Sequence, residues 1–136
     1  MAATTAQFGI TEVKVGRGSP WAAPLPLMIP RRIATELALT GAPMSAQRAY
    51  EIGFVNRLAE PGELVEVTQA LAEQIAANAP LSVAAGKQTM ALTAELPLRD
   101  AYQHAELLWA PVYLSEDAQE GMQAFGEKRA PQWKGR

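Results

Sequence analysis

Glu12 is the residue whose surroundings best suit proton-transfer chemistry. It lies between Ile10 and Val13, and the chain then runs through a glycine turn into a proline-rich loop that carries Trp21. Burial of a carboxyl group among apolar neighbours favours its protonated form, which suits a general acid or base. The other interpretation is a glutamate that faces solvent from a half-buried strand, and the local pattern alone favours that one.

Three other short patterns carry weaker chemical signals. GKQT at positions 86–89 resembles the end of a phosphate loop, but it lacks the upstream glycine and the hydroxyl residue after the lysine. GRG at positions 16–18 lacks the third glycine of a dinucleotide site, so a turn is favoured. His104 is the single histidine and has no second ligand at a useful spacing, so we expect a surface role and no metal site.

The elements around Glu12 are expected to be short. Alternating apolar residues indicate a short strand or extended segment from Phe8 to Val15, and the prolines that follow exclude a helix interior up to residue 30. Helices are predicted over 31–40 and, capped by Ser45, over 46–52, with a small strand at 54–58. No strand partner is obvious, so we expect the sheet to be completed by a larger architecture or another chain.

Beyond Gly62 the chain is predicted to be almost purely helical. Apolar residues at helical spacing indicate helices over 64–76, about 82–93, and from about 98. Ser115 is typical of an N-cap for a terminal helix, with Lys128 and Arg129 in its last turn and an irregular tail after it. We therefore place a boundary between residues 1–60 and 61–136.

The composition is that of a folded globular protein. Hydrophobic residues make up 49% of the 136 positions, and the net charge of −2 is too balanced for binding to nucleic acid. The absence of cysteine excludes disulfides and thiolate chemistry and permits a reducing compartment. Neither a signal peptide nor a membrane span is recognisable, so we expect a cytoplasmic location and no membrane partner.

Three blocks, in order, carry a family resemblance. AQFGITEVKVG, ATELALTGAPMSAQRAYEIGFVNRLAEPGEL and SEDAQEGMQAFGEKRAPQWKGR resemble the C-terminal half of the crotonase (enoyl-CoA hydratase/isomerase) superfamily, from about residue 6 to residue 136. The resemblance implies an α/β crotonase-like (ClpP/crotonase) spiral fold, truncated here and mostly α with a few short strands. Residues 1–60 would be the last part of the ββα spiral and residues 61–136 a helical trimerisation region.

The resemblance also implies site residues. Glu12 matches one of two family glutamates that hold the water and move a proton to or from the acyl α-carbon. Trp109, Phe125 and Lys128 match positions near the CoA moiety, although they are equally well explained as core residues and a surface charge. Trp21 lies in a loop that borders the acyl pocket in the family, where it would bind substrate or simply pack.

The function implied is that of an enoyl-CoA hydratase or isomerase acting on acyl-CoA thioesters, with syn hydration of a 2-enoyl-CoA as in fatty-acid β-oxidation. No cofactor is expected besides the CoA thioester substrate, and a homo-oligomer is expected, a trimer or a dimer of trimers. The family's oxyanion-hole segment and its GGG..EL helix with the second glutamate do not occur in this sequence.

Two features of the sequence leave other functions open. After Gly16 the sequence departs from the PGAGGTQRL that is usual in hydratases, so isomerase or other thioester chemistry is not excluded. Without the oxyanion-hole segment, a noncatalytic helical oligomerisation module, or an inactive fragment of such an enzyme, is the alternative function.

Overall fold

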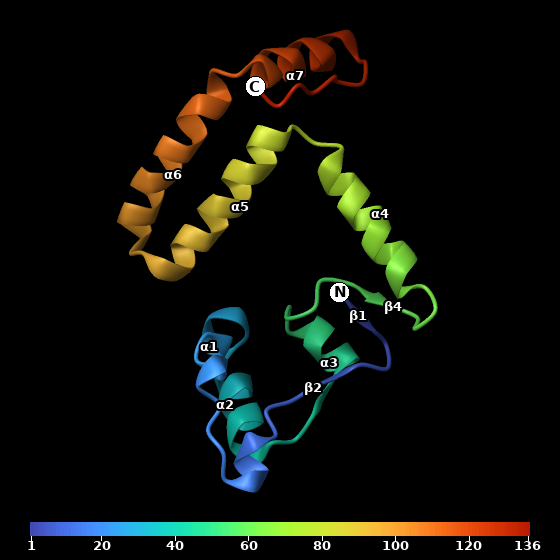
Figure 1. Ribbon diagram of the computed structural model, residues 1–136, viewed down its shortest axis with the longest axis vertical. Coiled ribbons are helices and arrows are strands. Elements are labelled where there is room, and N and C mark those ends of the chain that lie inside the picture. The colour runs from blue at the N-terminus through green and yellow to red at the C-terminus, as the bar shows by residue number, and fades with distance from the viewer. The chain divides into compact units, whose positions relative to one another are not determined.

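The computed structural model describes residues 1–136, which form two compact units, residues 1–70 and 71–136 (Figure 1). The division falls inside helix α4 (Leu64–Ala76), and the boundary expected between residues 60 and 61 stays a prediction. The first unit mixes short strands and short helices, whereas the second is helical apart from the C-terminal tail. No helix has both the length and the apolar character needed to cross a membrane.

The strands of the first unit pair with one another in two separate two-stranded sheets, and the completion of the sheet by a larger architecture or another chain stays a prediction. Strand β1 (Ala2–Ala3) is parallel to β4 (Leu58–Ala59), and β2 (Gln7–Phe8) is antiparallel to β3 (Met44–Ser45). Of the strand predicted at 54–58, only Leu58 lies in β4, and residues 54–57 are not part of a strand. Each ladder is only two residues long, so side-chain packing must hold this unit together.

The predicted extended segment from Phe8 to Val15 is wrong beyond Phe8. Residues Glu12–Val15 form a 3₁₀ helix, η1, that ends at Gly16 in the left-handed conformation, with φ of 67°. The left-handed turn at Gly16 costs glycine little, which explains why the helix ends there. Glu12 therefore lies on a helical turn and not on a strand.

The proline-rich loop contains two short helical turns, η2 (Pro20–Ala22) and α1 (Leu25–Met28). Their prolines occupy the first positions, where the missing N–H costs nothing. Helix α2 (Arg31–Thr40) begins after Pro30 and ends at Gly41, and α3 (Ala46–Glu51) is capped by the Ser45 hydroxyl, as predicted. The prolines therefore exclude long helices from this segment but permit single turns.

The core of the first unit gathers side chains from its strands, from η2 and from α1, α2 and α3. Its larger buried members are Ile10, Ile29, Leu37, Met44 and Val55, and several small alanines of α2 and α3 are buried with them. Phe8 and Phe54 meet edge to face with their ring centres 5.3 Å apart at the margin of this core. Ile10 anchors the chain just before Glu12, so the core fixes where η1 begins.

The second unit contains helices α5 (Pro80–Glu95), α6 (Leu98–Tyr113) and α7 (Glu116–Glu127), together with the end of α4. Helices α5 and α6 run side by side in opposite directions (Figure 1), around the buried Ala85, Ala101 and Val112. The helices predicted from apolar spacing are therefore confirmed. Small buried residues let the two helix backbones approach closely.

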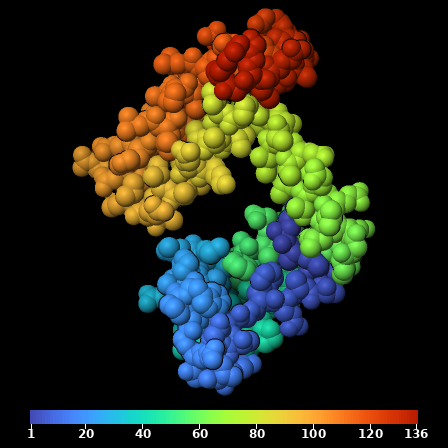
Figure 2. Space-filling model, in the orientation of Figure 1, coloured from blue at the N-terminus to red at the C-terminus, as the bar shows by residue number.

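The C-terminal tail folds back over α7. Trp133 packs on Gly121, and its indole nitrogen donates to the carbonyl oxygen of Ala77 at 2.8 Å. The carbonyl of Arg136 accepts from the amide of Glu116 at 2.8 Å, which satisfies a free N–H at the start of α7. In Figure 2 the red atoms of the tail lie directly against those of α7.

Candidate functional site

Glu12 is held at the first position of η1. Its backbone carbonyl accepts hydrogen bonds from the amides of Gly16 and Arg17, so the position of its Cα is fixed by the turn. The side chain is half-buried. A glutamate in this setting can reach both solvent and the apolar surface beside it.

Trp21 contacts Glu12 directly. Its indole nitrogen donates a hydrogen bond to Oε1 of Glu12 at 3.2 Å. The backbone of Trp21 is fixed by η2, which starts at Pro20, and the neighbouring Ala22 packs against the core. The sequence predicts Glu12 as a proton-transfer residue and Trp21 as a residue of the proline-rich loop. The structure brings the two side chains into contact.

An apolar pocket of about 300 Å³ lies beside Trp21, and Glu12 adjoins it only through its hydrogen bond with that residue. Trp21 forms part of its wall, and the other lining residues come from the strand, the proline-rich loop and α2–α3: Gln7, Phe8, Gly9, Ile10, Leu25, Leu37, Met44 and Phe54. Pockets of this size and character suit the apolar part of a small molecule. The alternation of Phe8 and Ile10 signals their burial, but the sequence does not reveal that Leu37, Met44 and Phe54 share a pocket with them.

A second pocket of about 380 Å³ lies between α2 and α3 and includes Glu36 and Arg48 in its lining. It is larger and more polar than the first. Neither Glu12 nor Trp21 lines it, and Arg48 is already paired with Glu51 at 3.1 Å. The pocket beside Trp21 is therefore the better candidate for a site that uses Glu12.

Trp109 lies in the second unit, between α5 and α6. Its indole nitrogen donates to the hydroxyl of Thr89 at 3.0 Å, and its ring stacks on Tyr113 with centres 6.2 Å apart. Gly86 leaves room for the ring on the facing helix. These contacts are those of a residue that packs two helices together.

Phe125 and Lys128 lie at the end of α7. Phe125 is 85% exposed, so it is no part of this unit's core. Helix α7 ends at Glu127, and Lys128 follows it in the left-handed conformation with φ of 55°. The predicted last turn with Lys128 and Arg129 is therefore wrong, because the chain has already left the helix at these residues. His104 is exposed on α6, as expected.

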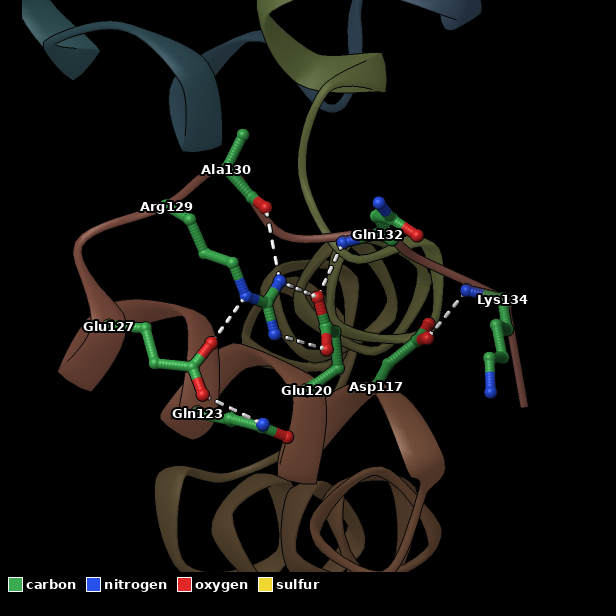
Figure 3. Close-up of polar contacts among 8 residues, drawn as sticks. All are labelled: Asp117, Glu120, Gln123, Glu127, Arg129, Ala130, Gln132 and Lys134. Carbon is green, nitrogen blue, oxygen red and sulfur yellow. Dashed lines mark hydrogen bonds and ion pairs between the residues drawn. The ribbon is translucent and has the colours of Figure 1, made fainter.

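A charged network that no sequence pattern indicates ties the tail to α7 (Figure 3). Arg129 makes two hydrogen bonds to the carboxylate of Glu120, at 2.6 and 3.0 Å, and one to Glu127 at 2.6 Å. The Arg129 guanidinium, together with the amide of Gln132, lowers the pKa of Glu120 to about 2. The two carboxylates in turn raise the pKa of Arg129 above its usual range. This cluster is satisfied internally and is therefore structural.

The comparisons with known proteins identify the family. The family model described as enoyl-CoA hydratase/isomerase matches residues 1–136. The chain belongs to the enoyl-CoA hydratase/isomerase family. The resemblance to the crotonase superfamily is thereby confirmed, and with it the crotonase-like fold, since solved enoyl-CoA hydratases superpose closely on the chain.

The chain is similar to several longer members of this family. It is 42% identical to (E)-benzylidenesuccinyl-CoA hydratase of Thauera aromatica over 99% of its own length and 54% of that protein's. It is also 42% identical to carnitinyl-CoA dehydratase of Salmonella typhi, over 98% of its own length and 54% of that protein's. The enoyl-CoA hydratase structure from Mycobacterium marinum is 45% identical, with a TM-score of 0.92 over 98% of this chain and 54% of that one. The chain thus spans about half the length of these relatives.

Proposed function

We propose that this family member carries the Glu12 part of an active site that adds water syn across a 2-enoyl-CoA thioester. The observation that carries the proposal is the Glu12 carboxylate, held at 3.2 Å by Trp21, whose ring lines an apolar pocket of about 300 Å³. A carboxylate beside an apolar pocket is suited to moving a proton at the head of an acyl chain that the pocket binds. The reaction requires no cofactor besides the CoA thioester.

The proposed chemistry moves one water molecule onto the double bond. The water oxygen bonds to the β-carbon and gives up one of its protons to a carboxylate, while the π electrons of the double bond move through the α-carbon to the thioester oxygen as an enolate. A proton then adds to the α-carbon and restores the thioester carbonyl. Glu12 supplies or relays a proton in this sequence, and a second carboxylate, as the family resemblance implies, shares the work. Reversal of the same steps is a dehydration, and a proton shift without water is an isomerisation.

The enolate needs hydrogen-bond donors that are aimed at its oxygen. Loss of a single such donor typically lowers the rate by about 10² to 10³. In the family, as the resemblance implies, a segment that this sequence does not match supplies them, and the chain spans 54% of the Thauera aromatica relative. We therefore propose that efficient catalysis requires the N-terminal part of the fold as well as these 136 residues.

The test compares the chain alone with the chain joined to the N-terminal half of the Mycobacterium marinum enoyl-CoA hydratase. Hydration of crotonyl-CoA is followed by the loss of its enoyl absorbance. We expect slow turnover by the chain alone and rapid turnover by the joined protein. Glu12→Gln in the joined protein should lower kcat by about 10² or more, the usual size of a general acid or base contribution.

Glu66→Gln is the matched control, because Glu66 is an exposed glutamate in the first turn of α4. It should leave kcat and KM at the values of the joined protein. A Glu12→Gln variant that turns over crotonyl-CoA as fast as its parent would remove Glu12 from the mechanism. Activity on a 3-enoyl-CoA in place of crotonyl-CoA would instead support an isomerase.

The second candidate function is self-association through the helical unit. Large apolar side chains stand exposed on its helices: Met90, Leu98, Leu107, Leu114, Met122 and Phe125, each at least 68% exposed. Monomeric proteins rarely expose so many large apolar side chains on one small unit. We propose that these residues meet other subunits in a trimer or a dimer of trimers, and that this module alone can be noncatalytic.

Sedimentation of the chain over a range of concentrations tests this candidate. The wild-type chain should sediment as a trimer or hexamer, and Phe125→Asp should shift it toward the monomer. Gln119→Asp, at an exposed polar position of the same helix, should leave the sedimentation unchanged. A wild-type chain that is monomeric at all concentrations would exclude self-association by this unit.

A further inference from the structure

We infer that Trp21 is a positioning residue that holds the Glu12 carboxylate with its indole N–H while its ring forms a wall of the acyl pocket. The inference rests on the proposed function of Glu12. It gives Trp21 two separable roles, one exerted through Glu12 and one through the apolar pocket. The binding role alone would not require any contact with Glu12.

The first observation is the isolation of the Glu12 carboxylate. Its backbone is fixed by η1, but Trp21 is the one hydrogen-bond partner of its side chain among the described residues. A glutamate has three side-chain torsions, and without a partner a half-exposed carboxylate samples several rotamers. The hydrogen bond from Trp21 selects one of these rotamers, in which Oε1 of Glu12 lies 3.2 Å from the indole nitrogen.

The second observation is the exposure of Trp21. Its side chain is 59% exposed, so burial of the ring is not what this position supplies to the fold. Tryptophan has a single side-chain donor, and here that donor is directed at a carboxylate. Pro20 and the packed Ala22 hold the backbone on both sides of it. The loop is thus built to present this ring at one place.

The third observation is that the same ring lines the apolar pocket, together with Phe8, Leu25 and Phe54. The lining is apolar apart from Gln7, so the pocket suits an uncharged aliphatic or aromatic acyl group. An acyl group in the pocket would touch the ring that holds Glu12. The fit of the acyl group therefore affects the orientation of the carboxylate, and a group that displaces the ring should react slowly even when it binds.

The hydrogen bond itself can be tested by NMR on the chain as it exists, without any activity. The chain has three tryptophans, and each indole N–H has a different acceptor: Glu12 for Trp21, Thr89 for Trp109 and Ala77 for Trp133. Glu12→Gln replaces a charged acceptor by a neutral one and should move the indole resonance of Trp21 alone. The other two resonances report that the fold is intact.

An unchanged Trp21 resonance in Glu12→Gln would overturn the inference. So would a Trp21 resonance that moves only together with those of Trp109 and Trp133, since that would reflect a general change of fold. Glu66→Gln serves as the matched control and should leave all three resonances in place.

Kinetics of the joined enzyme then separate the two roles of Trp21. Trp21→Phe removes the N–H and keeps an aromatic wall, so kcat should fall about tenfold with little change in KM. Trp21→Leu also removes the aromatic wall and should in addition raise KM for longer acyl-CoA substrates. Tyr50→Phe, which removes the hydroxyl of an exposed aromatic residue on α3, should change neither constant.

The outcomes distinguish the inference from the proposed function. If Glu12→Gln is as active as its parent, the proposed function fails. If Glu12→Gln is inactive while Trp21→Phe keeps the parental kcat, only the positioning role fails. A loss of kcat in Trp21→Phe at unchanged KM supports the positioning role, whereas an equal change of KM in Trp21→Phe and Trp21→Leu reduces Trp21 to a binding residue.

Discussion

The carboxylate of Asp117 accepts a hydrogen bond from the backbone amide of Lys134, at a distance of 2.6 Å. The other oxygen accepts one from the amide of Gly135 at 2.9 Å, and the residue is only 3% exposed. One buried side chain near the start of α7 thus satisfies two amides of the tail. Both of its oxygens act as acceptors, which a carboxylate can do and an amide cannot.

Asp117→Asn should therefore destabilise the protein although it changes the shape of the side chain very little. The amide NH₂ would face one of the two backbone donors and leave it without an acceptor, a loss of about 1 to 3 kcal/mol. Urea unfolding followed by circular dichroism measures the change. Asp100→Asn, at an exposed position in the first turn of α6, should cost much less. Equal losses in the two variants would contradict the structural role of Asp117.

The ion pairs of Glu120 predict a dependence of stability on pH. The pKa of Glu120 is lowered to about 2, chiefly by its hydrogen bonds from Arg129, and the pKa of Glu116 is lowered by Lys134 and Arg136. A carboxyl whose folded-state pKa is depressed stabilises the fold above its unfolded pKa and loses that contribution as the pH falls through the folded value. The Tm should thus decline between about pH 5 and pH 2.

Glu120→Gln tests the source of this pH dependence. The variant should have a lower Tm than the wild type at pH 7 and a shallower decline toward pH 2, and added salt should narrow the difference because these groups are solvent-accessible. Glu95→Gln removes an exposed glutamate of α5 that has no ion pair and should leave the decline unchanged. If the Tm of Glu120→Gln falls toward pH 2 as steeply as that of the wild type, groups other than Glu120 cause the pH dependence.

The glycines of α7 differ in what surrounds them, and their substitution should have opposite effects. A Cβ at Gly121 would lie 3.3 Å from the Trp133 ring, so the branched side chain of Gly121→Val should push the ring away from Ala77 and cost about 1 to 3 kcal/mol. Gly126 has no neighbour within 4 Å at its Cβ position. Gly126→Ala should be neutral or stabilise by up to about 1 kcal/mol. Thermal unfolding of both variants checks the contrast, and a stabilised Gly121→Val would contradict it.

Helices were predictable from this sequence because their signals are local. Ser45 and Ser115 mark two helix starts and Gly41 marks an end, and the structure has all three. The segment from Phe8 to Val15 was not predictable in this way. Its alternating residues fit a strand, but core packing of Ile10 and the turn at Gly16 impose a 3₁₀ helix instead.

The candidate site was only partly predictable for the same reason. The acid at position 12 is visible as an isolated carboxylate among apolar residues, and the family resemblance gave it a role. Its bond to Trp21 spans a loop of nine positions whose course depends on tertiary packing. The tail network depends on contacts between Glu120 and Arg129 across a chain reversal, for which no periodic pattern exists.

The close fit of Gly41 links the stability of the first unit to the placement of Glu12. Gly41 has φ of 61°, and a Cβ there would lie 2.9 Å from Cε of Lys14 and 3.0 Å from Cγ1 of Val13, both residues of η1. Gly53 has φ of 78° but open space around its Cβ position, so Gly53→Ala bears the backbone strain alone, about 1 to 2 kcal/mol. Gly41→Ala should lose about 1 kcal/mol more, because Val13 and Lys14 crowd this position and we expect η1 to shift to make room. That shift would displace Glu12, so the Trp21 indole resonance should move in Gly41→Ala and stay in place in Gly53→Ala. Equal losses of unfolding free energy in the two variants, with no change in this resonance, would show that Gly41 does not position η1.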